Sequence, residues 1–206
     1  MKDLTYKKVG GGITITGCDS SITGELIIPD KIDGLSVTSI GDSAFSGCIG
    51  LTSVIIPNSV TSIANYAFNV CIGLTRVTLP SSLTSIGQYA FWGCSKLMSV
   101  TFPSSLTSIG EGAFYWCTGL TNVTFPSSLT SIGQYAFEGC KGLTSVIIGN
   151  SLTEIGEGAF YGCTSLMAKN IQADPKFVIE VLSQIYNYYH NRSVVGETIQ
   201  GKLTLR

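Results

Sequence analysis

The residues of this chain that could do chemistry are its cysteines, its one histidine and a few glutamates. Six of the seven cysteines lie 23 residues apart: Cys48, Cys71, Cys94, Cys117, Cys140 and Cys163. Zinc sites need thiolates or imidazoles in close pairs such as C-x-x-C, and the sequence has no such pair and a single histidine, His190. We therefore expect no metal site, and nothing in the sequence indicates a cofactor.

The fixed spacing of the cysteines also argues against disulfides between them. Equivalent residues on stacked coils lie about 5 Å apart, but their side chains run parallel rather than towards each other. The six periodic thiols are predicted to form a buried ladder of small apolar groups. Cys18 falls outside the period, and we expect it to be the one reactive thiol.

Hydrolytic chemistry is not indicated either. Serine and threonine are abundant, but no histidine lies within the repeats, so no Ser–His pair can form there. Two glutamates on neighbouring repeats could resemble the carboxylate pair of a glycosidase, but the pattern indicates no substrate cleft. These glutamates are Glu111, Glu138, Glu154 and Glu157. The sequence predicts a protein that is not an enzyme.

The elements that carry these residues repeat with the same interval of 23 residues, which also separates six phenylalanines: Phe45, Phe68, Phe91, Phe114, Phe137 and Phe160. A constant period of this length predicts a solenoid, in which each repeat buries its apolar face against its neighbours. In each repeat a pattern such as Leu51, Val54 and Ile56 before Pro57 indicates a strand that the proline ends. The strands should form a parallel sheet through Val54, Val77, Val100, Val123 and Val146.

The rest of the repeat predicts the other side of each coil. A second apolar pair such as Leu83 and Ile86 is followed by a turn at Gly87 and by Ala90–Phe91 in the core. The remaining segment is short enough for only a brief helical or 3₁₀ turn. We therefore expect an α/β fold, a right-handed solenoid of about six coils, with the parallel sheet on the concave face and short helical turns on the convex side.

The two ends depart from the period and are expected to be caps. Residues 1–39 are predicted to form an N-terminal cap with an irregular first coil, 40–166 the repeats, and 167–206 a C-terminal capping helix and tail. Asp174–Pro175 is a helix start, followed by apolar residues at helical spacing to about residue 190. This helix either covers the last coil or docks on another protein or domain. The alternating tail 197–206 is expected to be either a strand or the start of a further module.

Composition excludes some partners. Charged residues are 12% of the chain and the net charge is −1, so no basic face exists to bind nucleic acid. No stretch approaches the roughly 20 apolar residues of a membrane span. The first residues lack a hydrophobic signal core, which fits either a cytosolic protein or one whose leader has been removed.

Two surface features vary between repeats and are candidate binding sites. Because the phenylalanines already fill the core, the other aromatic residues beside Ala-Phe should be partly exposed and able to anchor a partner. The candidates are Tyr89, Trp92, Tyr115 and Trp116, with Arg76 on the outward row of the strands as a second site. The alternative is that these rings only stack on one another to seal the convex edge.

The unit LTNVTFPSSLTSIGQYAFEGC, residues 120–140, resembles the BspA-like leucine-rich repeat with its I-G-x-x-A-F-x-G-C signature. The resemblance extends from Ile40 to about Leu166, and more loosely from Ile13. It implies an adhesion or ligand-binding role at the cell surface or in secreted form in a host-associated microbe, and it brings no catalytic residues. The expected partner is a protein or glycan on a host or neighbouring cell, bound by a monomer without membrane insertion.

Two further functions are compatible with the sequence. The near-identity of the repeats fits a structural spacer within a longer surface protein. A file of threonines could instead order water, as in ice-binding solenoids, although its neighbouring residue is mostly serine rather than a second threonine. The file consists of Thr61, Thr84, Thr107, Thr130 and Thr153.

Overall fold

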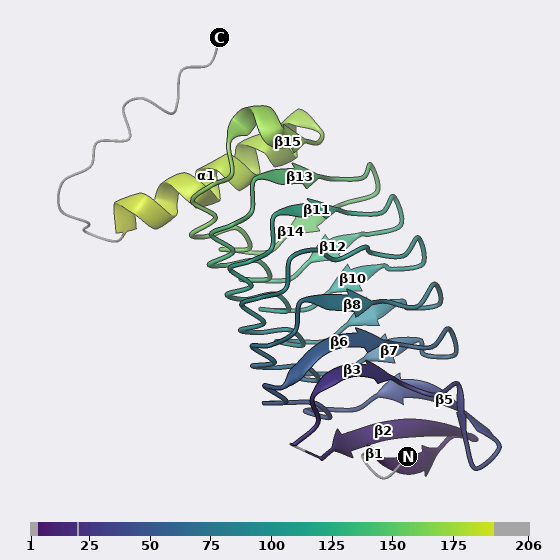
Figure 1. The fold of residues 1–206 in the computed structure, drawn as a ribbon. Coiled ribbons are helices and arrows are strands. Elements are labelled where there is room, and N and C mark those ends of the chain that lie inside the picture. Colours follow the sequence, from purple (N-terminus) through teal and green to yellow (C-terminus); the bar gives the residue numbers. More distant parts are fainter. Residues whose placement is uncertain (1–3, 20, 192–206) are drawn as a thin grey trace.

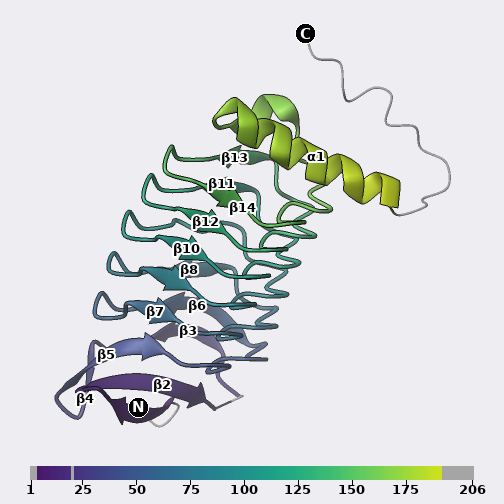
Figure 2. The ribbon, with the colours of Figure 1, turned by 180° about the vertical axis from the view of Figure 1, so that it is seen from behind.

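The computed structural model describes residues 4–19 and 21–191, which wind through a stack of coils (Figure 1). A hairpin lies at the N-terminal end of the stack, and helix α1 (Pro175–Asn191) crosses the other end in both views (Figure 2). Seven successive parallel strands run along one wall, one in each coil. The stack therefore has seven coils rather than the six expected, because the irregular N-terminal region completes the first one.

That wall, here called the Ser-Ile wall, was predicted only as an apolar pair in each repeat. Its strands pair in register, so that Ser62 lies beside Ser85 and Ile63 beside Ile86. The isoleucines of this wall are buried and the serines beside them are half-buried, except in the last strand, where Glu154 replaces the serine and Ile155 is half-buried. The strands are β2 (Gly12–Cys18), β5 (Leu35–Ile40), β7 (Ser62–Ile63), β9 (Ser85–Ile86), β10 (Ser108–Ile109), β12 (Ser131–Ile132) and β14 (Glu154–Ile155).

The second wall, the valine wall, is the predicted parallel sheet. Val54 pairs with Val77, and Val123 pairs with Val146. Single bridges from Ser99 to both neighbouring strands carry the wall through the coil of Val100. The named strands are β3 (Gly24–Ile27), β6 (Leu51–Ile55), β8 (Arg76–Thr78), β11 (Asn122–Thr124), β13 (Ser145–Ile147) and β15 (Ile171–Gln172). The handedness of the coil and the concave position of this wall stay predictions.

The third side of each coil, from the turn glycine to the cysteine, is a series of turns. Among the described residues, no helix lies within residues 41–163, so the expected short helical turns are not found there. The reason is where the backbone hydrogen bonds go. The N–H of Phe45 donates to the carbonyl of Ala67 in the next coil at 2.7 Å, and the same bond recurs from Phe68, Phe91, Phe114 and Phe137. A helix would need these N–H groups for bonds within its own coil.

The phenylalanines form a continuous stack along the core. All six are 0% exposed, and neighbouring rings lie nearly parallel, from 4.9 Å between the centroids of Phe45 and Phe68 to 5.6 Å between those of Phe137 and Phe160. Offset stacking of this kind adds to the burial of apolar area. The predicted phenylalanine core is confirmed.

The periodic cysteines form the predicted buried ladder, and all of them are free thiols. The Sγ of Cys71 donates to the carbonyl of Phe45 at 3.0 Å, and the next four cysteines repeat this bond at 3.2–3.3 Å. Burial raises the pKa of both Cys94 and Cys140 to about 12. The thiols from Cys71 to Cys163 are fully buried and bonded to carbonyls, so they are structural.

Separate elements close the two ends. At the N-terminal end, β1 (Leu4–Val9) pairs antiparallel with β2, and the extra residues of the irregular coil form β4 (Lys31–Ile32), antiparallel to β5. At the C-terminal end lie a 3₁₀ turn (Ala168–Asn170) and α1. Helix α1 begins at the predicted position, where the side chain of Asp174 accepts a hydrogen bond from the N–H of Lys176 at 3.0 Å. The predicted strand at 197–206 lies outside the described residues.

Helix α1 covers the last coil and satisfies its open backbone. Phe160 has no further coil to bond to, and its N–H donates instead to the side chain oxygen of Gln184 at 3.1 Å. The amide nitrogen of Gln184 donates to the carbonyl of Gly156 at 3.0 Å. Gln184 is 5% exposed, and Val181 beside it is fully buried. The side chain of Gln184 thus forms hydrogen bonds with the last coil that the backbone of a further coil would otherwise form.

Replacing Phe114 with alanine should lower the free energy of unfolding by about 3–5 kcal/mol, because it opens a cavity in the middle of the ring stack. Denaturant unfolding measures the change, with Met98→Ala, at a side chain that is 56% exposed, as the control. A loss below about 1 kcal/mol would show that the ring is not core.

Replacing Gln184 with alanine should destabilise the chain by about 1–3 kcal/mol, because it leaves the buried N–H of Phe160 without an acceptor. The matched control is Gln172→Ala, at an exposed side chain on β15, which should change stability by less than about 0.5 kcal/mol. Equal effects of the two substitutions would contradict the role assigned to Gln184.

Candidate functional site

The aromatic residues of the turn side form one connected cluster. The rings of Tyr66 and Tyr89 stack with centroids 5.3 Å apart. Trp92 meets Tyr89 edge-on at 6.0 Å and Tyr115 at 6.3 Å. A groove of about 620 Å³, here called the aromatic groove, is lined by Tyr66, Tyr89, Trp92, Tyr115, Tyr135, Glu138 and Tyr161. Three of the four aromatic residues predicted as a site, Tyr89, Trp92 and Tyr115, therefore lie together in it.

The backbone that presents these tyrosines is unusual. Tyr66, Tyr89 and Tyr135 have φ angles of 53–57°, in the left-handed region that favours glycine. Gly112 and Gly158 occupy the same slot in other coils, with φ of 55° and 65°. The occurrence of both glycine and tyrosine in one slot is a sequence signal for this positive φ.

The glycines of this slot also make room for the rings. A Cβ on Gly112 would collide with the ring of Tyr89, and a Cβ on Gly158 would collide with the ring of Tyr135. Each of these rings therefore lies over the glycine of the next coil. The hydroxyl of Tyr89 is fixed as well, because it donates to Oε1 of Glu111 at 2.6 Å. This hydrogen bond raises the pKa of Tyr89 to about 12.

Trp116 belongs to the edge of the cluster rather than to the groove. It lies in the slot that holds Gly93 and Gly139 in neighbouring coils, with φ of 59° against 71° and 72°. Its ring packs over Gly139, lies 6.4 Å from the ring of Tyr115 and is approached by Nζ of Lys141 at 5.4 Å. The side chain is nevertheless 44% exposed.

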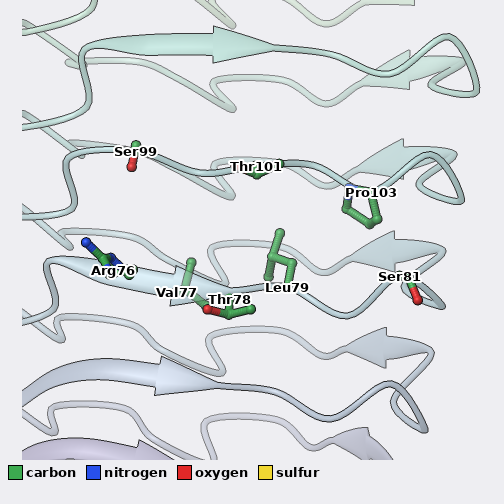
Figure 3. Close-up of a pocket in the computed structure, with 8 residues that line it drawn as sticks. All are labelled: Arg76, Val77, Thr78, Leu79, Ser81, Ser99, Thr101 and Pro103. Carbon is green, nitrogen blue, oxygen red and sulfur yellow. The ribbon is translucent and has the colours of Figure 1, made fainter.

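Arg76 lies at a different place on the molecule. It lines a shallow hollow of about 490 Å³ between β8 and the next coil, together with Ser99, Thr101 and Pro103 (Figure 3). This hollow shares no lining residue with the aromatic groove. The structure thus separates the two predicted sites and does not unite them.

The threonine file is bonded into the stack. The hydroxyl of Thr84 donates to the carbonyl of Thr61 at 3.1 Å, and Thr107 bonds to Thr84 in the same way at 3.0 Å. Thr61, Thr130 and Thr153 repeat the bond. Each hydroxyl proton is therefore used between coils and is not available to order water.

Within the part of the chain that the structure describes, no group of three or more His, Cys, Asp or Glu residues could hold a metal ion. No helix in these described ranges is both long and apolar enough to cross a membrane. Glu111, one of the carboxylates considered for a glycosidase-like pair, accepts a hydrogen bond from Tyr89.

Comparison with solved structures places the fold among bacterial leucine-rich repeat proteins. A leucine-rich repeat protein of T. pallidum has 32% identity and a TM-score of 0.74, over 87% of this chain and 94% of that one. A protein of Bacteroides ovatus has 33% identity and a TM-score of 0.74, over 81% of this chain and 45% of that one. A leucine-rich cell surface protein of Faecalibacterium prausnitzii has 30% identity and a TM-score of 0.67, over 80% of this chain and 52% of that one.

This chain spans about half the length of the latter two proteins. Among proteins of curated function, none matches the sequence. The model of the BspA-type leucine-rich repeat region matches six copies across residues 38–167, the span in which the ring stack, the cysteine ladder and both walls repeat. The chain belongs to the BspA-type leucine-rich repeat family.

Proposed function

We propose that this chain is a non-catalytic binding module of a host-associated bacterium, at the cell surface or secreted, and that it holds a protein or glycan ligand in the aromatic groove. The observation that carries the proposal is that large aromatic residues occupy backbone positions suited to glycine and are still partly exposed, Tyr66 by 36% and Trp116 by 44%. A cell surface protein among the structural relatives supports the proposed location.

The conformational free energy that these aromatic residues cost at positive φ supports a role other than stabilising the fold. A non-glycine residue in the left-handed region costs roughly 1–2 kcal/mol, and glycine in the same slot avoids it. Trp116 occupies such a position and is 44% exposed, and Trp92, whose ring also contacts Tyr115, is 38% exposed. Burial of the remaining ring surface by a ligand offsets that cost, and rings of this kind dominate binding energies at interfaces.

The spacer alternative rests on the stacking of the rings on one another. Tyr66 and Tyr89 stack as neighbours in a sealed edge would, and Tyr89 is tied to Glu111. Such packing also preorganises a binding surface, because rings that are already fixed lose little freedom when a ligand binds. The two functions differ in what happens when the exposed tryptophans are removed.

The Arg76 hollow is the second candidate surface. It combines one guanidinium with the hydroxyl groups of Ser99 and Thr101, all of them exposed. It would suit an acidic or polar group of a ligand that reaches the valine wall. The ice-binding alternative is disfavoured, because the threonine hydroxyl protons are used between coils.

A double substitution with residues that other coils carry in the same slots should remove binding without unfolding the chain. Trp92→Ser copies Ser46, and Trp116→Gly copies Gly93 and relieves the positive φ. Once a ligand is identified on a glycan array or a panel of purified extracellular proteins, the double variant should bind it at least about 10-fold more weakly. Its thermal midpoint should stay within a few degrees of that of the parent.

The control is Met98→Ser, which removes another exposed apolar side chain and should leave both affinity and stability unchanged. If the double variant keeps its thermal midpoint and binds as tightly as the parent, the ligand uses another surface, and Arg76→Ser tests the second candidate. If the double variant unfolds, the rings serve the stack and the spacer function is the better one.

A further inference from the structure

The first cysteine of the ladder has a different partner from all the others. From Cys71 to Cys163, each Sγ donates to the carbonyl of the phenylalanine 26 positions earlier. The Sγ of Cys48 instead lies 2.6 Å from the Sγ of Cys18. Cys18 thus takes the place that a main-chain carbonyl fills in the later coils.

The two thiols are held together by the N-terminal cap. Cys18 is the last residue of β2 and is paired with Leu4 of β1, whereas Cys48 belongs to the turn that completes the following coil. Strand β2 also pairs in parallel with β5, the strand that precedes Cys48. The segments that carry the two cysteines are therefore joined by one sheet. The two sulfurs lie 2.6 Å apart, which is longer than the bond of about 2.05 Å in a disulfide but closer than any other pair of thiols that the structure records. The two thiols are therefore within reach of each other in the folded chain.

The same region is also the one where an oxidant can enter. Cys18 is partly exposed, whereas the thiols from Cys71 to Cys163 are fully buried. Those inner thiols are each bonded to a carbonyl and do not face one another. Oxidation is therefore confined by geometry to one pair among the seven cysteines.

We propose that Cys18 and Cys48 form a disulfide that staples the N-terminal cap to the stack when the protein meets a disulfide oxidant such as oxidised glutathione. In the first step one cysteine thiolate attacks the oxidant, forms a mixed disulfide and releases one glutathione thiolate. In the second step the other cysteine thiolate attacks its partner's sulfur and releases the second glutathione. Two protein thiols lose two electrons and two protons in total, and one glutathione disulfide becomes two glutathione thiols.

The disulfide would stabilise the N-terminal end of the stack. It closes a loop between residues 30 positions apart, which restricts the unfolded chain and favours the folded one. Burial raises the pKa of Cys18, so little thiolate exists at neutral pH and the bond forms slowly. The exchange should therefore be brought to equilibrium at mildly alkaline pH, where more of the thiolate is present.

The test uses the whole chain, equilibrated with oxidised glutathione at pH 8.5, then quenched with acid, denatured and alkylated. The parent should show five free thiols instead of seven and, before alkylation, a mass lower by two hydrogens, with no glutathione attached. Its thermal midpoint should be several degrees higher than that of the reduced chain, and dithiothreitol should reverse the change. Fragmentation of the linked peptides should place the bond between Cys18 and Cys48.

Two variants make the test specific. Cys18→Ser changes a partly exposed side chain, so it should fold, and it should keep its remaining thiols free and show no rise in thermal midpoint. The control Cys71→Ser, one rung further along the ladder, should still form the bond. The proposal is overturned if the parent keeps seven free thiols, if Cys18 retains a glutathione adduct, or if the bond forms in Cys18→Ser.

Discussion

The structure depends on one constraint, which is that every coil must offer its neighbour the same backbone groups at the same height. On all three sides the N–H groups of one coil donate to carbonyls of an adjacent coil, in the two walls and in the turns alike. Side chains at equivalent positions then lie directly over one another. A ring stacks on a ring, a thiol reaches the same carbonyl, and a threonine hydroxyl bonds to the threonine before it. The 23-residue period of the sequence follows from this requirement.

The two ends must satisfy the same constraint without a neighbouring coil. At the C-terminal end, the helix brings Gln184 to the N–H that would otherwise lack an acceptor. At the N-terminal end, an antiparallel hairpin covers the first coil, and Cys18 meets the thiol of the first rung. Both caps use side chains for contacts that the main chain makes elsewhere in the stack.

The sequence was informative where repetition reveals packing, and uninformative where a residue departs from the period. The phenylalanine core, the cysteine ladder and the valine wall follow directly from the spacing, and Asp174–Pro175 located the helix start. The short helical turns are not confirmed, because spacing does not tell which N–H groups bond within their coil and which bond to the next one. The Ser-Ile wall was not recognised, because two residues per coil are too few to show the alternation of a strand. Cys18 could not be paired with Cys48, since it lies off the period and only the fold brings the two together.

For the candidate site, exposure of the tryptophans was predictable from the sequence, but the separation of Arg76 from the aromatic groove became visible only in the structure.

The central claim is that the turn side is bonded between coils and is not helical, which is what holds the aromatic rings in their positions. Amide hydrogen exchange resolved by residue tests this claim directly. The N–H groups of Phe68, Phe91, Phe114 and Phe137 should exchange as slowly as those of the two walls, because they open only when the coils separate. Exchange of these four amides at the rates of exposed loops, while the walls stay protected, would contradict it.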